Sequence, residues 1–279
     1  MVSQSVPSPL AGEGEGGGVP PSGGRRGIFY GWYIVAAGSG IQFLVGALLD
    51  GAVGGYAAAL TRDYGWTRSA LSGAFSVSRL LAGFANYPLG RMIDRLGPRV
   101  VMRAGLILYA LGFFLFARLD SLPLFYAASI LLAVGSNVGG FLPITTVMVN
   151  WFDRYRARAI SLSFIGYAFG GLVAPAVILA ITHDWRLTSL GSGLAVFAIG
   201  LPLTFLMHQR PELRGLRIDG ATAAEAAHRD AEVAAARTSS STISFTAGEA
   251  VRTRAFWMIA LGHGSSLLVV AAVQVSQLE

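Results

Sequence analysis

Long runs of apolar residues, separated by short polar segments, make up most of this chain. Each run has roughly 20 mainly uncharged residues, the length that a helix needs to cross the hydrocarbon core of a bilayer. The pattern predicts six complete spans and a seventh run, at about residues 27–60, 68–90, 100–119, 121–152, 159–182, 187–207 and 255–278. We therefore expect an all-α integral membrane protein.

Two polar segments lie outside these spans. Residues 1–27 are rich in Gly, Pro and Ser, a composition typical of disorder. Residues 208–254 separate the sixth run from the seventh. The sequence therefore predicts a disordered N-terminal segment, a six-span bundle over residues 28–207, a central linker over 208–254 and a seventh span over 255–279.

Composition supports a membrane protein and excludes a nucleic-acid-binding one. Of the 279 residues, 53% are hydrophobic and 13% are charged, whereas soluble domains carry roughly 25% charged residues. The net charge of +6 comes with 21 arginines and no lysine, and the arginines stand in short groups between apolar runs. A nucleic-acid-binding protein gathers its basic residues on one polar face, so we expect no nucleic-acid partner.

Sequence patterns of enzymes are missing as well. The chain has no Cys, its four His are scattered, and it contains no H-E-x-x-H, G-x-S-x-G or P-loop pattern. We therefore predict that the protein is not an enzyme, that it needs no metal or cofactor, and that ATP does not drive it directly.

The arginines also predict the orientation of the chain in the membrane. Of the 21 arginines, sixteen fall on the side that holds the N-terminus, four fall on the opposite side, and Arg79 lies inside a span. Basic residues accumulate in cytoplasmic loops, so the bias places the N-terminus and the 208–254 linker in the cytoplasm. We expect the protein in the cytoplasmic (inner) membrane of a bacterium.

One charged loop between the second and third runs matches a known pattern. Gly90, Asp94, Arg95, Gly97 and Arg99 fit the G-x-x-x-D-R-x-G-x-R/K loop of the major facilitator superfamily, which joins the second and third helices in that family. The loop is expected to turn tightly at Gly97. Gly90 is expected to end the second span, and Asp94 to accept hydrogen bonds from nearby arginines or to lie at a helix N-terminus.

Longer stretches resemble one branch of that family. The stretches "FYGWYIVAAGSGIQF", "DYGWTRSALSGAFSVSRLLAGFANYPLGRMIDRLGPR" and "NWFDRYRARAISLSFIGYAFGGLVAPAV" resemble monocarboxylate transporters and oxalate/formate antiporters. The resemblance implies a twelve-span protein of two six-helix halves, of which this chain holds the first half and a truncated seventh span. It also implies that the charged loop has a gating role.

The resemblance further implies a function. We expect a secondary active transporter that moves small organic anions, monocarboxylates or dicarboxylates, by alternating access. A proton or a counter-substrate is the expected coupled partner. Two alternatives remain open at this point: an exporter of another small molecule from the same superfamily, and a non-transporting multi-span receptor or scaffold.

Arg79 is the most informative single residue. It lies eleven residues from Arg68 and from Gly90, roughly 16 Å from either end of its span. An arginine at that depth is costly and faces a cavity or a partner. The small or polar residues on its helix face are Ser72, Ser76, Gly83 and Asn86.

Two roles are open for Arg79. Its planar guanidinium can hold a substrate carboxylate through paired hydrogen bonds. It can equally neutralise Asp50 of the first span. The two roles are compatible, because an ion pair that opens for an anion would couple binding to gating. Asp50 is therefore grouped with the gating residues.

Two further residues are weaker candidates for the same cavity. Asn137 in the fourth run either binds substrate or forms hydrogen bonds within the bundle. Tyr167 in the fifth run either faces the cavity or fills space. The predicted substrate-binding set is Arg79, Ser76, Asn86, Asn137 and Tyr167.

Overall fold

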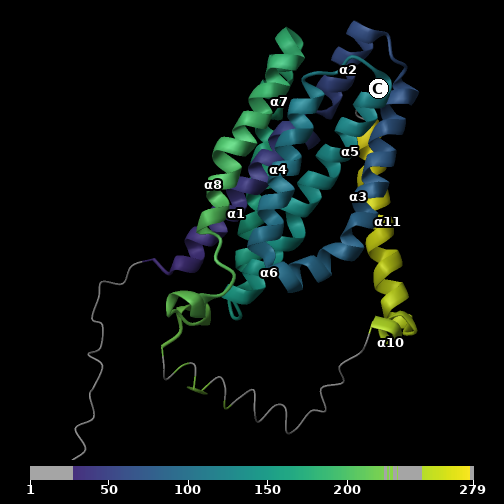
Figure 1. Ribbon diagram of the computed structural model, residues 1–279. Coiled ribbons are helices and arrows are strands. Elements are labelled where there is room, and N and C mark those ends of the chain that lie inside the picture. Colours follow the sequence, from purple (N-terminus) through teal and green to yellow (C-terminus); the bar gives the residue numbers. More distant parts are fainter. Residues whose placement is uncertain (1–27, 223–224, 226, 229–230, 232–246, 277–279) are drawn as a thin grey trace, which may run out of the picture.

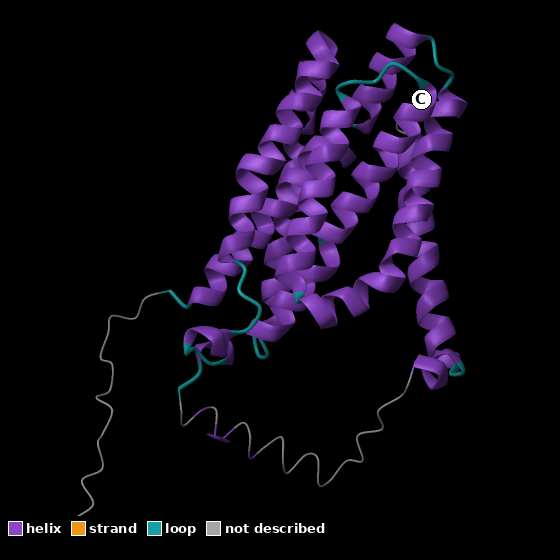
Figure 2. Cartoon of the chain, in the orientation of Figure 1, coloured by secondary structure: helices purple, strands orange, loops and turns teal. Residues whose placement is uncertain are grey.

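The computed structural model describes residues 28–222, 225, 227–228, 231 and 247–276. Within these residues the chain consists of helices and loops, with long helices packed side by side (Figures 1 and 2). The all-α prediction is therefore confirmed. The disorder predicted for residues 1–27 lies outside the described residues, as does much of the 208–254 linker.

The first span is one rod made of three pieces. It contains α1 (Tyr30–Val45), a π-helical turn η1 (Gly46–Asp50) and α2 (Val53–Tyr64). The left-handed backbone of Gly65 (φ +66) ends the rod. Thr67 then caps the next helix, α3 (Arg68–Leu96), because its hydroxyl accepts a hydrogen bond from the Ala70 amide at 3.3 Å.

The turn between the second and third spans lies at Gly97, as predicted. Gly97 has φ +82, and α4 (Pro98–Phe116) starts at the proline that follows. A Cβ at Gly97 would meet only the side-chain amide of Gln209, which can move aside, so the backbone angle is what requires glycine here.

Gly90 does not have the role expected from the sequence. α3 continues through Gly90 as far as Leu96, and a Cβ at Gly90 would meet nothing within 4 Å. Gly90 therefore neither ends the second span nor permits a close helix approach. A single glycine lowers helix propensity by only about 1 kcal/mol, and the helical residues on either side outweigh it.

The fourth span is broken, and the fifth and sixth form a hairpin. α5 (Leu122–Gly139) and α6 (Phe141–Trp151) meet at Gly140. α7 (Arg156–Ala195) continues through a second π-helical turn, η2 (Val196–Gly200), into α8 (Leu201–Leu206). The backbone of Asp184 is not helical, with φ −154° and ψ 100°, so the chain reverses there.

Hydrogen bonds at the two ends of the bundle fix the direction of this hairpin. Trp185 donates to the Asp63 carboxylate at 2.7 Å, and Asp63 lies at the end of the first span. Arg99 donates to the Phe205 carbonyl at 2.8 Å, beside the Gly97 turn. We call the end that holds Asp63 and Trp185 the Trp66 end of the bundle. The end that holds Arg99 and Phe205 is the Gly97 end.

Further helices follow α8 in the described chain. They are the short 3₁₀ helices η3 (Pro211–Arg214) and η4 (Ile218–Gly220), then α10 (Ala247–Val251) and α11 (Arg254–Ser276). Among the described residues, four stretches are long and apolar enough to cross a membrane, namely 30–64, 98–116, 122–151 and 156–206. The last contains the two spans of the hairpin. α3 is not among the four, yet it packs against α5 in the same bundle.

Small residues bring the first span and α7 into close contact. A Cβ on Gly46 would lie 2.5 Å from the Tyr167 carbonyl oxygen, and one on Gly170 would lie 2.5 Å from the Phe43 carbonyl oxygen. Such spacing is possible only where glycine lets two helix backbones touch. This contact carries Tyr167 to the side of the π-helical turn, where the candidate site lies.

Candidate substrate cavity

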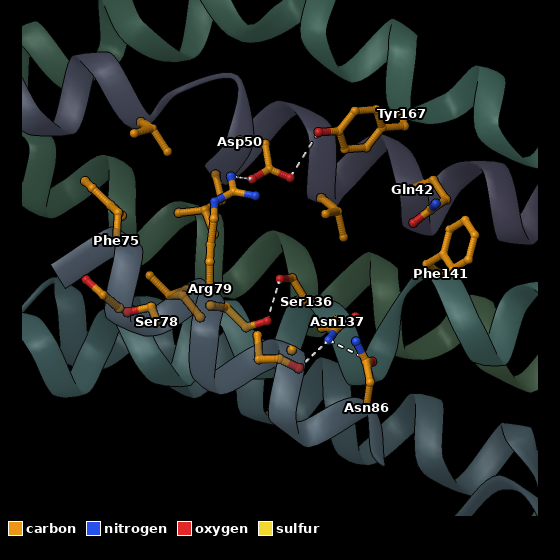
Figure 3. Close-up of a pocket in the computed structure, with 18 of the residues that line it drawn as sticks. Gln42, Asp50, Phe75, Ser78, Arg79, Asn86, Ser136, Asn137, Phe141 and Tyr167 are labelled. Carbon is orange, nitrogen blue, oxygen red and sulfur yellow. Dashed lines mark hydrogen bonds and ion pairs between the residues drawn. The ribbon is translucent and has the colours of Figure 1, made fainter. Parts of the chain in front are cut away.

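A cavity of about 670 Å³ lies among the first span, α3, α5 and α7, with contributions from α6. That volume is in the range of small-molecule sites. Its walls are mostly apolar, with a small number of polar side chains (Figure 3): Gln42, Asp50, Ser78, Arg79, Asn86, Ser129, Ser136, Asn137 and Tyr167. Four of the five predicted substrate-binding residues therefore line one cavity.

Asp50 is the centre of the polar contacts. It is the last residue of the π-helical turn, a type of distortion that is frequent at functional sites. One carboxylate oxygen accepts a hydrogen bond from Nη2 of Arg79 at 3.1 Å, and the other accepts one from the Tyr167 hydroxyl at 3.1 Å (Figure 3). A single carboxylate thus links the first, second and fifth spans.

Arg79 is only partly engaged by this ion pair. Its side chain is 65% exposed, compared with 23% for Asp50. Among the described residues, the contact with Asp50 is the hydrogen bond that its guanidinium makes. A guanidinium has five N–H donors, so Arg79 retains donors for a bound anion. The predicted pairing with Asp50 is present, and it leaves room for the second role.

Asn86 and Asn137 lie in the cavity wall and bond to each other. The side-chain amide of Asn137 donates to the Asn86 side-chain oxygen at 3.0 Å and to the Ala82 carbonyl at 2.8 Å. These bonds tie α5 to α3. Asn137 therefore lines the cavity and also forms hydrogen bonds within the bundle, which was the alternative considered for it.

Ser76 lies outside the cavity, and Ser78 takes its place. A helix turns by about 100° per residue, so Ser78 and Ala82 lie on one side of Arg79 and Ser76 lies on the other. The cavity faces the first of these sides. Ser76 is exposed, whereas Ser78 is buried and donates to the Ala74 carbonyl at 2.6 Å. Of the residues expected on the face of Arg79, Gly83 and Asn86 line the cavity, whereas Ser72 and Ser76 do not.

The charged loop lies away from the cavity, at the Gly97 end. Arg99 donates to the carbonyls of Thr204 at 3.2 Å and Phe205 at 2.8 Å, which joins the start of α4 to the end of α8. Asp94 and Arg95 are exposed in the last turn of α3. Neither makes a hydrogen bond or ion pair among the described residues, so the bonds expected between Asp94 and nearby arginines are not formed there.

The sequence reasoning missed four polar residues of the cavity: Gln42, Ser78, Ser129 and Ser136. Gln42 is buried in the first span, and Ser136 lies one residue before Asn137 in α5. Gln42 carried a usable signal, because it is an amide within a long apolar run. Serine carries a weaker signal, since its hydroxyl is readily satisfied by a backbone carbonyl of the same helix, as Ser136 is by Ala133 at 3.1 Å.

Comparisons with known proteins agree with the architecture. The sequence profile of the Major Facilitator Superfamily matches residues 25–277. The chain is 28% identical over 182 residues to the 4-hydroxybenzoate transporter PcaK of Pseudomonas aeruginosa, which covers 63% of this chain and 40% of that protein.

Two further relatives match shorter stretches. The probable anion transporter 4 of Arabidopsis thaliana, a chloroplastic protein, is 34% identical over 120 residues, or 41% of this chain and 22% of the relative. The oxalate:formate antiporter of Oxalobacter formigenes is 28% identical over 118 residues, or 42% of this chain and 28% of the relative. The chain spans less than half the length of each of these curated relatives. With a profile match along nearly all of its length, the chain belongs to the Major Facilitator Superfamily, a family of membrane transporters and not of enzymes.

Proposed function

We propose that the protein is a secondary active transporter of small organic anions, monocarboxylates or dicarboxylates, that works by alternating access. The observation that carries the proposal is the partly engaged cation Arg79 in the wall of a largely apolar cavity. The names of the relatives support the same class, because they specify 4-hydroxybenzoate, oxalate, formate and anions. We place the chain in the monocarboxylate-transporter and oxalate/formate-antiporter branch.

The contacts of Asp50 suggest how binding and gating are coupled. An arriving carboxylate competes with Asp50 for the guanidinium of Arg79, while the Tyr167 hydroxyl keeps a hydrogen bond to Asp50. When Arg79 exchanges Asp50 for the substrate, the link between the first span and α3 loosens. The ion pair of Asp50 with Arg79 can therefore act as a switch. Because the anion adds negative charge to a site whose ion pair is neutral, we propose that a proton or a counter-substrate accompanies it.

The gating proposal extends to the Gly97 end. There the Gly90–Arg99 segment, which contains Asp94, Arg95 and the turn at Gly97, regulates the opening of the bundle. We also propose that residues 28–207 form one half of a twelve-span protein, with 208–254 as linker and 255–279 as the start of the other half. Two halves rocking about a central site is the usual form of alternating access.

Uptake measurements on Arg79 variants test the proposal. In cells that express the chain within its complete reading frame, Arg79→Gln should abolish uptake of labelled carboxylates. Arg79→Lys should reduce it at least about tenfold, because lysine keeps the charge and loses the planar fork. Arg118→Gln, at an exposed arginine outside both the cavity and the Gly90–Arg99 segment, is the matched control. Normal uptake by Arg79→Gln at equal membrane abundance would refute the proposal.

Orientation has its own test. We propose that the N-terminus and the Gly97 end face the cytoplasm of a bacterial cell, because sixteen of the 21 arginines fall on that side. Ser69 and Leu96 are exposed at opposite ends of α3, in a chain without cysteine. A membrane-impermeant thiol reagent should label Ser69→Cys in intact cells and leave Leu96→Cys unlabelled. The opposite pattern would invert the topology.

A further inference from the structure

Three arginines gather at the Gly97 end, and among the described residues none of them has a carboxylate partner. Arg99 and Arg103 lie one turn apart on α4, and both reach the last turn of α8. Arg99 donates to the Phe205 carbonyl at 2.8 Å, and Arg103 donates to the Thr204 hydroxyl at 3.1 Å. The guanidinium carbon of Arg103 also lies 4.1 Å from the centroid of the Phe205 ring.

The third arginine approaches the same helix end from another element. The guanidinium carbon of Arg214, in η3, lies 4.0 Å from the centroid of the Tyr30 ring. The Tyr30 hydroxyl donates to the Leu206 carbonyl at 2.9 Å, which fixes that ring at the end of α8. Arg99 and Arg103 thus contact Phe205, and Arg214 contacts the tyrosine bonded to Leu206, so the three cations surround the last turn of α8.

The protein groups around these cations supply little compensating charge. No carboxylate of the described residues lies within 4.0 Å of Arg99, Arg103 or Arg214. The carbonyls at the end of α8 contribute a partial negative charge of about one half. Three full positive charges facing about half a negative charge leave a strong preference for an added anion.

An apolar surface continues from the three arginines along the bundle. Ile107 and Leu111 follow Arg103 at successive steps of four residues on α4, so they share its helix face. Their side chains are exposed, as are those of Phe197 and Phe205 on the neighbouring helical segment. In an integral membrane protein such a surface faces lipid chains. The arrangement thus offers cations at one level and an acyl-chain surface beside them.

We propose that Arg99, Arg103 and Arg214 bind the phosphate of an anionic phospholipid whose acyl chains lie on the apolar surface between α4 and α8. Arginine suits this role because its guanidinium pairs with phosphate oxygens through two N–H donors. The site is separate from the cavity around Arg79. It depends on the placement of the chain in a membrane and not on which substrate the protein moves.

Lipid binding to the purified protein in detergent tests the site. Native mass spectrometry would give the dissociation constant for phosphatidylglycerol in the parent and in the variant Arg103→Gln with Arg214→Gln. Each arginine near an anionic lipid surface contributes about fivefold to affinity, so the double variant should bind about 25-fold more weakly. Arg99 is left in place because it also caps the carbonyls of α8.

The matched control removes two arginines from the same end of the bundle. Arg154→Gln with Arg158→Gln makes the same charge change on exposed residues beside Tyr155. This control should keep parental affinity for phosphatidylglycerol. Equal weakening in both double variants would overturn the site in favour of diffuse attraction. The unfolding temperature without lipid verifies that each variant is folded.

Two other ligands test whether binding needs both the net negative charge and the acyl chains of the lipid. Phosphatidylcholine with the same acyl chains has a phosphate but no net charge, and it should bind at least about tenfold more weakly than phosphatidylglycerol. Inorganic phosphate should not displace phosphatidylglycerol at millimolar concentration, because it lacks acyl chains. Equal binding of phosphatidylcholine, or displacement by inorganic phosphate, would refute an anionic-lipid site.

Discussion

The first span meets α7 and α3 in opposite ways. On the α7 side, Gly46 and Gly170 let the two backbones touch, and no side chain separates them. On the α3 side, a cavity of about 670 Å³ opens, and the ion pair of Asp50 with Arg79 crosses it at 3.1 Å. The interface with α7 is a direct contact between helix backbones, whereas the interface with α3 is bridged by two charged side chains.

The difference indicates which contact can change in the proposed transport cycle. Close-packed backbones have no second arrangement of similar energy, because even a small shift loses many van der Waals contacts. An ion pair between partly exposed side chains is weak and can exchange partners. We therefore expect the first span and α7 to move as one body, while the contact between the first span and α3 responds to substrate.

The largest expected effect comes from filling the packed interface. A Cβ at Gly166 would overlap the Ser39 carbonyl of the first span, whereas a Cβ at Gly171 would meet nothing within 4 Å. Gly166→Leu should cost about 3 kcal/mol or more of folding free energy and greatly reduce the yield of monodisperse protein. Gly171→Leu, on the same helix, should change little. Similar unfolding temperatures for the two variants would contradict the proposed packing.

The next effect concerns the bridged interface. Arg79→Gln leaves Asp50 without its cation, and the double variant Asp50→Asn with Arg79→Gln removes both charges. If Arg79 binds substrate, the double variant should regain the stability lost by Arg79→Gln, about 1 kcal/mol, and remain inactive in uptake. Thermal unfolding and uptake of a labelled carboxylate measure the two quantities. Recovery of uptake would show that Arg79 serves only to neutralise Asp50.

The contrast between the interfaces was partly visible in the sequence. Apolar runs predicted the spans, because bilayer thickness fixes their length. The position of Arg79 predicted a polar site and a pairing with Asp50. Gly166 and Gly170 stand four residues apart in an apolar run, a spacing typical of close helix packing, and both lie against the first span.

Other features depend on tertiary contacts that no local pattern specifies. The π-helical turn that ends at Asp50 and the break at Gly140 arise from how neighbouring helices pack. The choice of Ser78 over Ser76 depends on the rotation of α3, which periodicity fixes only to within a residue or two. At Gly90 the prediction was wrong for another reason: a family pattern suggested a helix end, but α3 continues past this residue.

A smaller effect is expected where α3 is held to α5. Asn137→Leu removes both hydrogen bonds from the Asn137 amide, to Ala82 and Asn86. Hydrogen bonds between membrane helices contribute on average about 0.6 kcal/mol, so the loss should be about 1 kcal/mol. Thermal unfolding in detergent measures it, with Ser136→Ala as the control that keeps both bonds. A loss above about 3 kcal/mol would mean that this pair, and not the backbone packing, fixes the bundle.

Tyr167→Phe should give the smallest change, and it examines the point where the two interfaces meet. The substitution removes one hydroxyl and leaves the ring and the packing of α7 unchanged. Asp50 then loses one of its two hydrogen bonds and holds Arg79 more tightly, so a substrate carboxylate competes less well. With about 1 kcal/mol for such a bond, KM should rise about fivefold while the maximal uptake rate changes little. Tyr33→Phe is the control, because Tyr33 lies on α1 away from the cavity. An unchanged KM would show that the Tyr167 hydroxyl does not affect the competition between substrate and Asp50 for Arg79. A large loss of the maximal uptake rate would indicate that this hydroxyl is needed for the movement of the bundle instead.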